Sequence, residues 1–212
     1  MTPRFAQAVD PLMLHVLGML ERINRGERQS PQDERAHLRA LLDRAEAIVG
    51  STPDWGLAKY ALVSWIDEVL VETAWDGAEW WSNNAMEVEI FQSRLCNEQF
   101  YTQAQRASAL PTRDALEVFY VCVVLGFRGL YRDPEMAAMF TSVNNLPADL
   151  ETWAKQTAMA IRLGQGRPPL TGVRRELTGA PPLKMRPLAV WSWLAFMLLT
   201  TGGVVYYALY AS

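Results

Sequence analysis

Asp67, Glu68 and Glu72 form the one carboxylate cluster in the sequence whose spacing suits chemistry. Residues four positions apart share a helix face, so Glu68 and Glu72 can point together and bind a divalent cation or act as acid and base. No histidine or third ligand joins them in the sequence. The cluster therefore has two interpretations: a metal-dependent site of a membrane-tethered enzyme, or an acidic, solvated surface that docks a partner. We favour docking.

Other candidates for catalysis are sparse. The two histidines, His15 and His37, fall on different predicted helices and in no motif, and we expect His37 to be a surface residue. Cys96 and Cys122 lie inside apolar helical patterns without metal-ligand spacing. Glycine-rich phosphate loops, dinucleotide fingerprints and the GxSxG elbow are absent from the sequence. We therefore predict no catalytic residue, no cofactor and no bound metal, and a protein that is not an enzyme.

The acidic cluster lies on a predicted helix that begins at Thr52-Pro53 and is apolar over a wide arc, which places it at the centre of its domain. Apolar residues recur at helical spacing along nearly the whole chain, and no alternating strand pattern appears. The prediction is an all-α helical bundle of about seven to eight helices. The other expected helices run from after Pro11 to near Gly26, from Ser30 to Gly50, through Trp80 to Phe91, around Phe100, from Asp114 to an end at Gly126 and Gly129, after Asp133, and from Pro147 to Leu163.

Charge divides the chain unevenly. The formal net charge is −3, and residues 165–212 carry five basic residues against Glu176, a net of +4, which leaves −7 for residues 1–164. An acidic domain lacks the basic stripe that nucleic-acid binding requires, so we exclude nucleic acid as a partner. Residues 1–164 are enough for one domain with its own core.

The stretch from Leu188 to Tyr210 is apolar without a charged residue and long enough to cross a bilayer. Tryptophans near its start and tyrosines near its end suit the two membrane interfaces, and the basic residues before it predict a cytoplasmic N-terminal domain. The predicted organisation is a cytoplasmic domain (1–164), a basic Pro/Gly linker (165–187), a single transmembrane helix (188–210) and a short periplasmic tail (211–212).

The expected transmembrane helix contains a patch of small residues at Thr200, Thr201, Gly202 and Gly203. Small side chains let two helix backbones approach closely within a bilayer. We expect this patch to pack against a partner's transmembrane helix.

Two segments resemble the DotU/TssL family of bacterial secretion systems. They are YALVSWIDEVLVETAWDGAEWWS at residues 60–82 and EVFYVCVVLGFRGLYR at residues 117–132, where LGFRGLY is similar to the family's LGFxGxY signature. The resemblance implies an inner-membrane component of a type VI secretion system, or of its type IVB relative. By that implication the protein joins an IcmF-like partner (TssM), receives a TssK-like baseplate component and self-associates in the membrane complex.

The family's helical domain has a cleft near the acidic helix, so the resemblance places Asp67 and Glu68 on that acidic surface. It implies that Gly126, Phe127, Gly129 and Tyr131 shape a helix end rather than perform chemistry. Some members append a peptidoglycan-binding domain after the span, and this sequence stops two residues past it, so we expect another subunit to supply anchoring to the cell wall. A tail-anchored adaptor outside secretion systems is a third possibility, which the two motifs disfavour.

Overall fold

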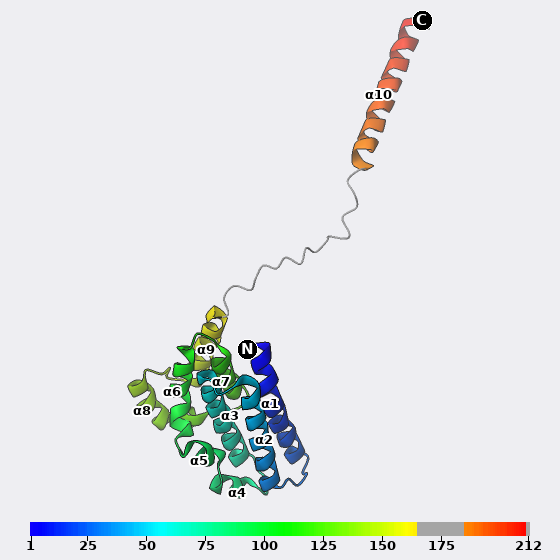
Figure 1. Ribbon diagram of the computed structural model, residues 1–212. Coiled ribbons are helices and arrows are strands. Elements are labelled where there is room, and N and C mark those ends of the chain that lie inside the picture. The colour runs from blue at the N-terminus through cyan, green and yellow to red at the C-terminus, as the bar shows by residue number, and fades with distance from the viewer. Residues whose placement is uncertain (165–184, 211–212) are drawn as a thin grey trace. The chain divides into compact units, whose positions relative to one another are not determined.

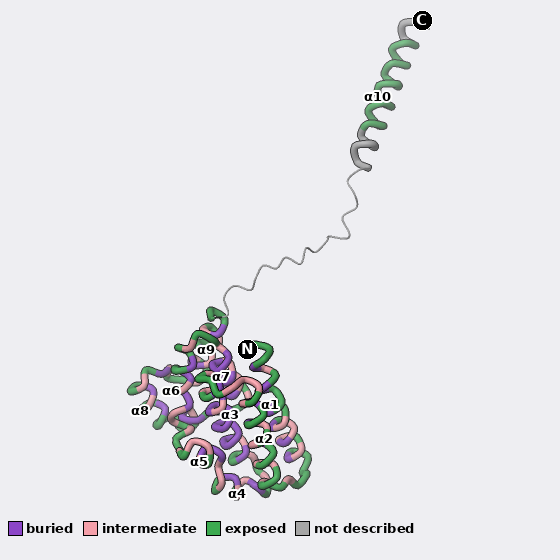
Figure 2. Tube along the Cα trace, in the orientation of Figure 1, coloured by how far each residue is buried: buried purple, intermediate pink, exposed green. Residues whose placement is uncertain are grey.

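The helix that carries the acidic cluster forms the centre of the fold. In the computed structural model, which describes residues 1–164 and 185–210, helix α3 spans Pro53–Glu72. Twelve of its twenty residues are buried, and the tube of α3 in Figure 2 is correspondingly purple along most of its length. A helix buried on this scale is covered by neighbours on several sides. The central position predicted from its apolar arc is confirmed.

The described part of the chain is helical, with no strand, which confirms the predicted all-α class. Figure 1 shows α1 and α2 side by side, with α2 next to α3 and most of the later helices on the other side of α3. The other elements of this unit are α1 (Pro3–Asn24), α2 (Pro31–Val49), α4 (Ala78–Asn83), α5 (Met86–Phe91), α6 (Cys96–Ser108), α7 (Asp114–Val124), the 3-10 turn η1 (Gly129–Arg132), α8 (Pro134–Asn144) and α9 (Leu150–Gly164).

The capping residues predicted from the sequence mark the ends of α2 and the start of α3. The Ser30 hydroxyl accepts the backbone N–H of Asp33 at 3.4 Å, and the Thr52 hydroxyl accepts that of Trp55 at 3.2 Å. Such caps satisfy backbone donors that have no partner within the helix. Gly50 ends α2 with a φ of 84°, a conformation that glycine adopts without steric cost. These boundaries are as predicted.

The prediction that the first helix begins after Pro11 is wrong. Helix α1 begins at Pro3 and contains Pro11 within it. Thr2-Pro3 repeats the start signal of Thr52-Pro53, and the Thr2 hydroxyl and backbone N–H both bond the carboxylate of Asp114, each at 2.6 Å. Pro11 is exposed and costs the helix one hydrogen bond, while Leu12 beside it is fully buried, so packing outweighs the loss.

Helix α7 packs along α3 in the most extensive contact between any two elements, as its apolar seam predicts. It ends at Val124, and Gly126 follows with a φ of 114°. The chain then turns back toward α3, where the indole N–H of Trp65 donates to the carbonyl of Leu125 at 3.4 Å. The turn after α7 therefore lies against the acidic end of α3.

Helix α10 (Met185–Tyr210) belongs to a second unit of the chain. It begins three residues before the span predicted from Leu188. Among the described residues, no helix combines the length and hydropathy of a membrane-crossing segment. Most of the predicted linker (165–184) and the predicted tail (211–212) lie outside the described residues.

Candidate functional site

The three predicted acidic residues line one cleft at the C-terminal end of α3. This cleft has a volume of about 330 Å³. Asp67, Glu68 and Glu72 come from α3, Glu87 from α5 and Arg132 from η1. The remaining lining residues are Val71, Ser82, Ala85, Arg94, Cys96 and Asn97. The structure thus brings the sequence-predicted residues together and adds Glu87 and two arginines to them.

Asp67 is buried, and its carboxylate caps the start of α5. Its carboxylate accepts the indole N–H of Trp81 at 2.9 Å and the backbone N–H groups of Met86 at 3.0 Å and Glu87 at 2.8 Å. Those two amides begin α5, so Asp67 caps a helix 19 residues away in sequence. Burial raises the pKa of Asp67 to about 6, although the three donors oppose the shift.

The capping by Asp67 explains why the helical pattern expected from Trp80 to Phe91 is interrupted. The chain forms α4, leaves helical geometry at Asn84 and Ala85, and begins again as α5, whose first amides face Asp67. The periodicity of the side chains gave no sign of this break. The buried carboxylate of Asp67, which is distant in sequence but adjacent in space, supplies the hydrogen bonds that make a new helix start at Met86 favourable.

Glu68, the next residue of α3, makes an equivalent contact with the turn after α7. Its carboxylate accepts the backbone N–H groups of Arg128 at 2.7 Å and Gly129 at 3.0 Å, and it forms an ion pair with Arg132 at 3.1 Å. Asp67 is 5% exposed and Glu68 8% exposed. The expectation that both lie on a solvated acidic face is therefore wrong, because backbone donors from α5 and η1 cover them.

Glu72 is the solvent-facing member of the cluster. Its side chain is 38% exposed and pairs with Arg132. Glu68 and Glu72 do share a helix face, as their spacing predicts, and they share the Arg132 guanidinium. The charge that the cleft offers to a visiting molecule from α3 is chiefly that of Glu72.

Glu87 is a buried carboxylate that sequence reasoning missed. It is 2% exposed, and its carboxylate accepts the backbone N–H of Leu95 at 3.0 Å and the hydroxyl of Tyr60 at 3.5 Å. Burial, followed by the charge of Glu87, raises the pKa values of the Tyr60 hydroxyl and the Cys96 thiol. The alternation of Glu87 and Glu89 with Met86 and Val88 gives no signal for burial, because it resembles a solvated edge.

The residues of the LGFRGLY motif shape the wall beside Glu68. Phe127 is buried and stacks on Phe100 with ring centroids 3.9 Å apart. Gly129 has a φ of 50°, and a Cβ there would lie 2.8 Å from the Phe127 ring. The hydroxyl of Tyr131 donates to the carbonyl of Pro147 at 2.6 Å. These contacts match the implied role of shaping a helix end. The two motif segments are joined by the bonds of Glu68 to the backbone of Arg128 and Gly129.

The histidines meet although the sequence gives no sign of it. The rings of His15 and His37 lie 4.3 Å apart across α1 and α2, and His15 Nε2 is 2.7 Å from a carboxylate oxygen of Glu34. His37 is exposed, as expected. Within residues 1–164 and the described part of α10, no three or more His, Cys, Asp or Glu residues are grouped to hold a metal ion.

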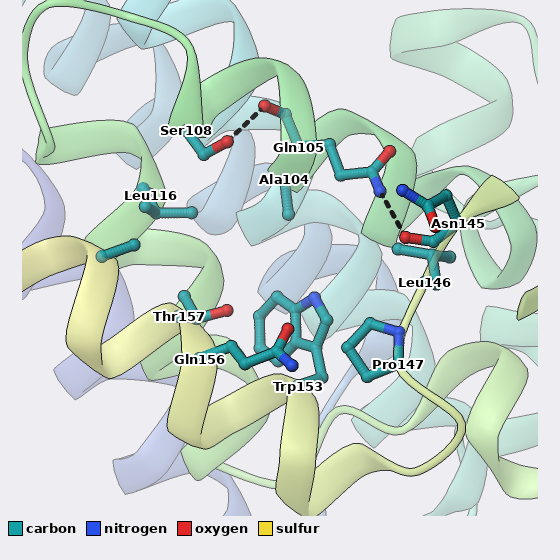
Figure 3. Close-up of a pocket in the computed structure, with 11 residues that line it drawn as sticks. Ala104, Gln105, Ser108, Leu116, Asn145, Leu146, Pro147, Trp153, Gln156 and Thr157 are labelled. Atoms are coloured by element: carbon teal, nitrogen blue, oxygen red, sulfur yellow. Dashed lines mark hydrogen bonds between the residues drawn. The ribbon is translucent and has the colours of Figure 1, made fainter.

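A second pocket, of about 180 Å³, lies between α6, α7, α9 and the loop after α8. Figure 3 shows Trp153 within it and the Gln105 amide directed at the backbone around Asn145. No charged side chain lines this pocket among the residues described, and none of its residues was a candidate from the sequence. The acidic cleft is therefore the better candidate site.

The small residues of α10 lie in the second unit. The hydroxyl of Thr200 donates to the carbonyls of Phe196 at 3.1 Å and Met197 at 3.0 Å, and an added Cβ at Gly202 or Gly203 would meet nothing within 4 Å. The hydroxyl is thus satisfied within its own helix, and the two glycines leave the helix backbone accessible.

Comparison with known proteins identifies the fold and the family. The cytoplasmic domain of TssL from Acinetobacter baumannii is similar in structure, with a TM-score of 0.56 and 24% sequence identity, over 74% of this chain and 98% of that one. Identity at this level shows the fold alone. No curated protein matches the chain. The family described as type VI secretion system protein DotU matches residues 4–211, nearly the whole sequence. The chain belongs to the DotU family of type VI secretion system proteins.

Proposed function

We propose that this protein is a structural component of a type VI secretion membrane complex, in which it links the cytoplasmic baseplate to an IcmF-like (TssM) inner-membrane partner. The observation that carries the proposal is the family match, which extends through α10 as well as the helical domain. In this role the protein acts through binding free energy, and it requires no catalytic residue.

The acidic cleft is the docking surface for the baseplate component, which would be TssK-like. Residues Asp67, Glu68 and Glu72 all contribute to this surface, but in different ways. Asp67 and Glu68 hold α5 and η1 in place and so set the shape of the walls. Glu72, at the exposed edge, supplies charge that steers a partner and selects its orientation.

The segment from Leu188 to Tyr210 crosses the bacterial inner membrane once. The N-terminal domain and the basic linker at 165–187 are on the cytoplasmic side, and the tail at 211–212 is in the periplasm. The support for this crossing is the uncharged apolar sequence and a helix of 26 residues. At about 1.5 Å per residue, this helix exceeds the hydrocarbon thickness of a bilayer.

The membrane contact is made by Thr200, Gly202 and Gly203, which pack against a transmembrane helix of the IcmF-like partner or of a second copy. The glycines provide the close approach, since nothing in this chain occupies the space an added Cβ would take.

Co-purification tests this function directly. The full chain, affinity-tagged at its C-terminus and isolated from native membranes in mild detergent, should recover an IcmF-like protein and a baseplate component identified by mass spectrometry. The matched control is the same chain with Glu72→Lys, which should retain the membrane partner and lose most of the baseplate component. Recovery of neither partner from wild-type membranes under secretion-competent conditions would refute the proposal.

A further inference from the structure

Helix α8 is lightly attached to the rest of its domain. Only Ala137 and Thr141 of its eleven residues are buried. Met136, Met139 and Val143 are exposed, and Val143 shows 80% of its surface. A helix that buries so little apolar area gains little free energy from packing, so its position depends on the contacts at its two ends.

The two ends of the α8 segment are held together by a contact between Tyr131 and Pro147, which we call the neck. The hydroxyl of Tyr131, before α8, donates to the carbonyl of Pro147, after it, at 2.6 Å. The Tyr131 ring packs edge-on against Tyr101 with centroids 4.7 Å apart. The Gln105 amide donates to the carbonyls of Asn144 at 3.2 Å and Asn145 at 3.4 Å (Figure 3). The neck is thus fixed to α6 through Tyr101 and Gln105, and Asn144 is the one residue of α8 that takes part in it.

Arg132 lies between the neck and α8. Its guanidinium forms ion pairs with Glu68 at 3.1 Å and with Glu72, and both partners are on α3. The next residue, Asp133, caps α8 by accepting the backbone N–H of Glu135 at 2.9 Å. Arg132 is 48% exposed, so solvent and salt can reach the ion pairs that fix the first turn of α8.

We propose that Arg132 is a latch that holds α8 against the body of the domain, and that breaking its ion pairs lets α8 swing out about the Tyr131–Pro147 neck. Release of α8 exposes Ala137 in addition to Met136, Met139 and Val143, which are already exposed. The latch opens one short helix while α3 and the rest of the core stay folded, because the neck and the Glu68 bonds to Arg128 and Gly129 do not require Arg132.

Amide hydrogen exchange of the full chain purified in detergent tests the latch. In Arg132→Gln, amides of α8 should exchange about two- to fivefold faster than in the wild type, the effect of losing half-exposed ion pairs. Amides of α3 and α7 should keep their wild-type rates. Raising NaCl from 0.05 to about 0.5 M should accelerate α8 exchange in the wild type, because salt screens exposed ion pairs, and should leave Arg132→Gln unchanged.

Arg94→Gln is the matched control, because Arg94 lines the same cleft and forms no ion pair with any residue that the structure describes. It should leave α8 exchange as it is in the wild type. The latch is overturned if Arg132→Gln leaves α8 exchange unchanged, if α3 accelerates as much as α8, or if the salt dependence survives in the variant.

Discussion

The carboxylate of Glu68 accepts the backbone N–H of Gly129 at 3.0 Å, across 61 positions of sequence. This bond joins the acidic helix α3 to the turn after α7, and it is made by the two segments that resemble the family's signatures. Glu68, which the sequence predicted to face solvent, is therefore a buried residue that connects two parts of the core. Its first role is structural, and the charge it contributes to the cleft is secondary.

Replacing Glu68 should destabilise the domain far more than replacing Glu72. In Glu68→Ala the buried N–H of Gly129 loses its partner, and we expect a loss of about 2–4 kcal/mol in the free energy of unfolding. Glu72→Ala removes a half-exposed ion pair and should cost under about 1 kcal/mol. Urea unfolding measures both. Equal effects of the two substitutions would contradict the structural role of Glu68 in connecting α3 to the turn after α7.

Asp67 should make stability depend on pH. Its pKa is raised from 3.8 to about 6 in the folded state, so between these values the folded protein binds more protons than the unfolded chain. Its contribution to stability is therefore fully present below pH 4 and is lost as pH rises through 6, by at most about 3 kcal/mol.

The measurement is the difference in unfolding free energy between the wild type and Asp67→Asn, from pH 4 to pH 7. This difference should shift against the wild type as pH rises, because asparagine does not ionise. A shift in the wild type's favour would show that the donors from Trp81, Met86 and Glu87 outweigh burial, and would contradict the prediction.

Charge reversal at Glu72 should weaken baseplate docking without unfolding the domain. A lysine at this exposed position opposes a basic partner surface and leaves the buried bonds of Asp67 and Glu68 in place. We expect a two- to tenfold rise in Kd, roughly the effect of one charge at the rim of an interface. Glu79→Lys, at an exposed position of α4 outside the cleft, is the control. Unchanged binding by Glu72→Lys, or equal weakening by both variants, would count against docking at the cleft.

Alanine at two glycines should have opposite effects on stability. Gly129→Ala places a Cβ 2.8 Å from the Phe127 ring and should destabilise the domain by about 1–3 kcal/mol. Gly56→Ala, in α3, meets nothing within 4 Å and should stabilise by about 0.5–1 kcal/mol through helix propensity. Thermal unfolding compares them, and a neutral Gly129→Ala would show that the Phe127 wall yields without cost.

Bulk at Gly202 and Gly203 should reduce recovery of the membrane complex. Leucine at both positions fills the space a partner helix would use, so pull-down of the IcmF-like protein should fall several-fold while membrane insertion persists. Val204→Leu with Val205→Leu adds bulk to the next two positions of α10 and serves as the control. Full recovery with leucine at the glycines would remove this patch from the interface.

The sequence by itself determined the class of the fold, its central helix and several helix ends. Apolar periodicity identifies α3, and Ser30, Thr52 and Gly50 mark ends, because caps and amphipathic faces depend on neighbours within a few residues. Thr2-Pro3 carried the same signal for α1, and the prediction gave Pro11 more weight than it has in a helix anchored by Asp114.

Only the tertiary structure decided what the acidic residues do. Spacing placed Glu68 and Glu72 on one face, but their environments depend on backbone amides of α5 and η1 that arrive from 19 to 61 residues away. Burial of Glu87, the meeting of His15 with His37 and the break between α4 and α5 have the same origin. A long-range contact is set by packing across the whole domain, and no local pattern encodes which donor will cover a carboxylate.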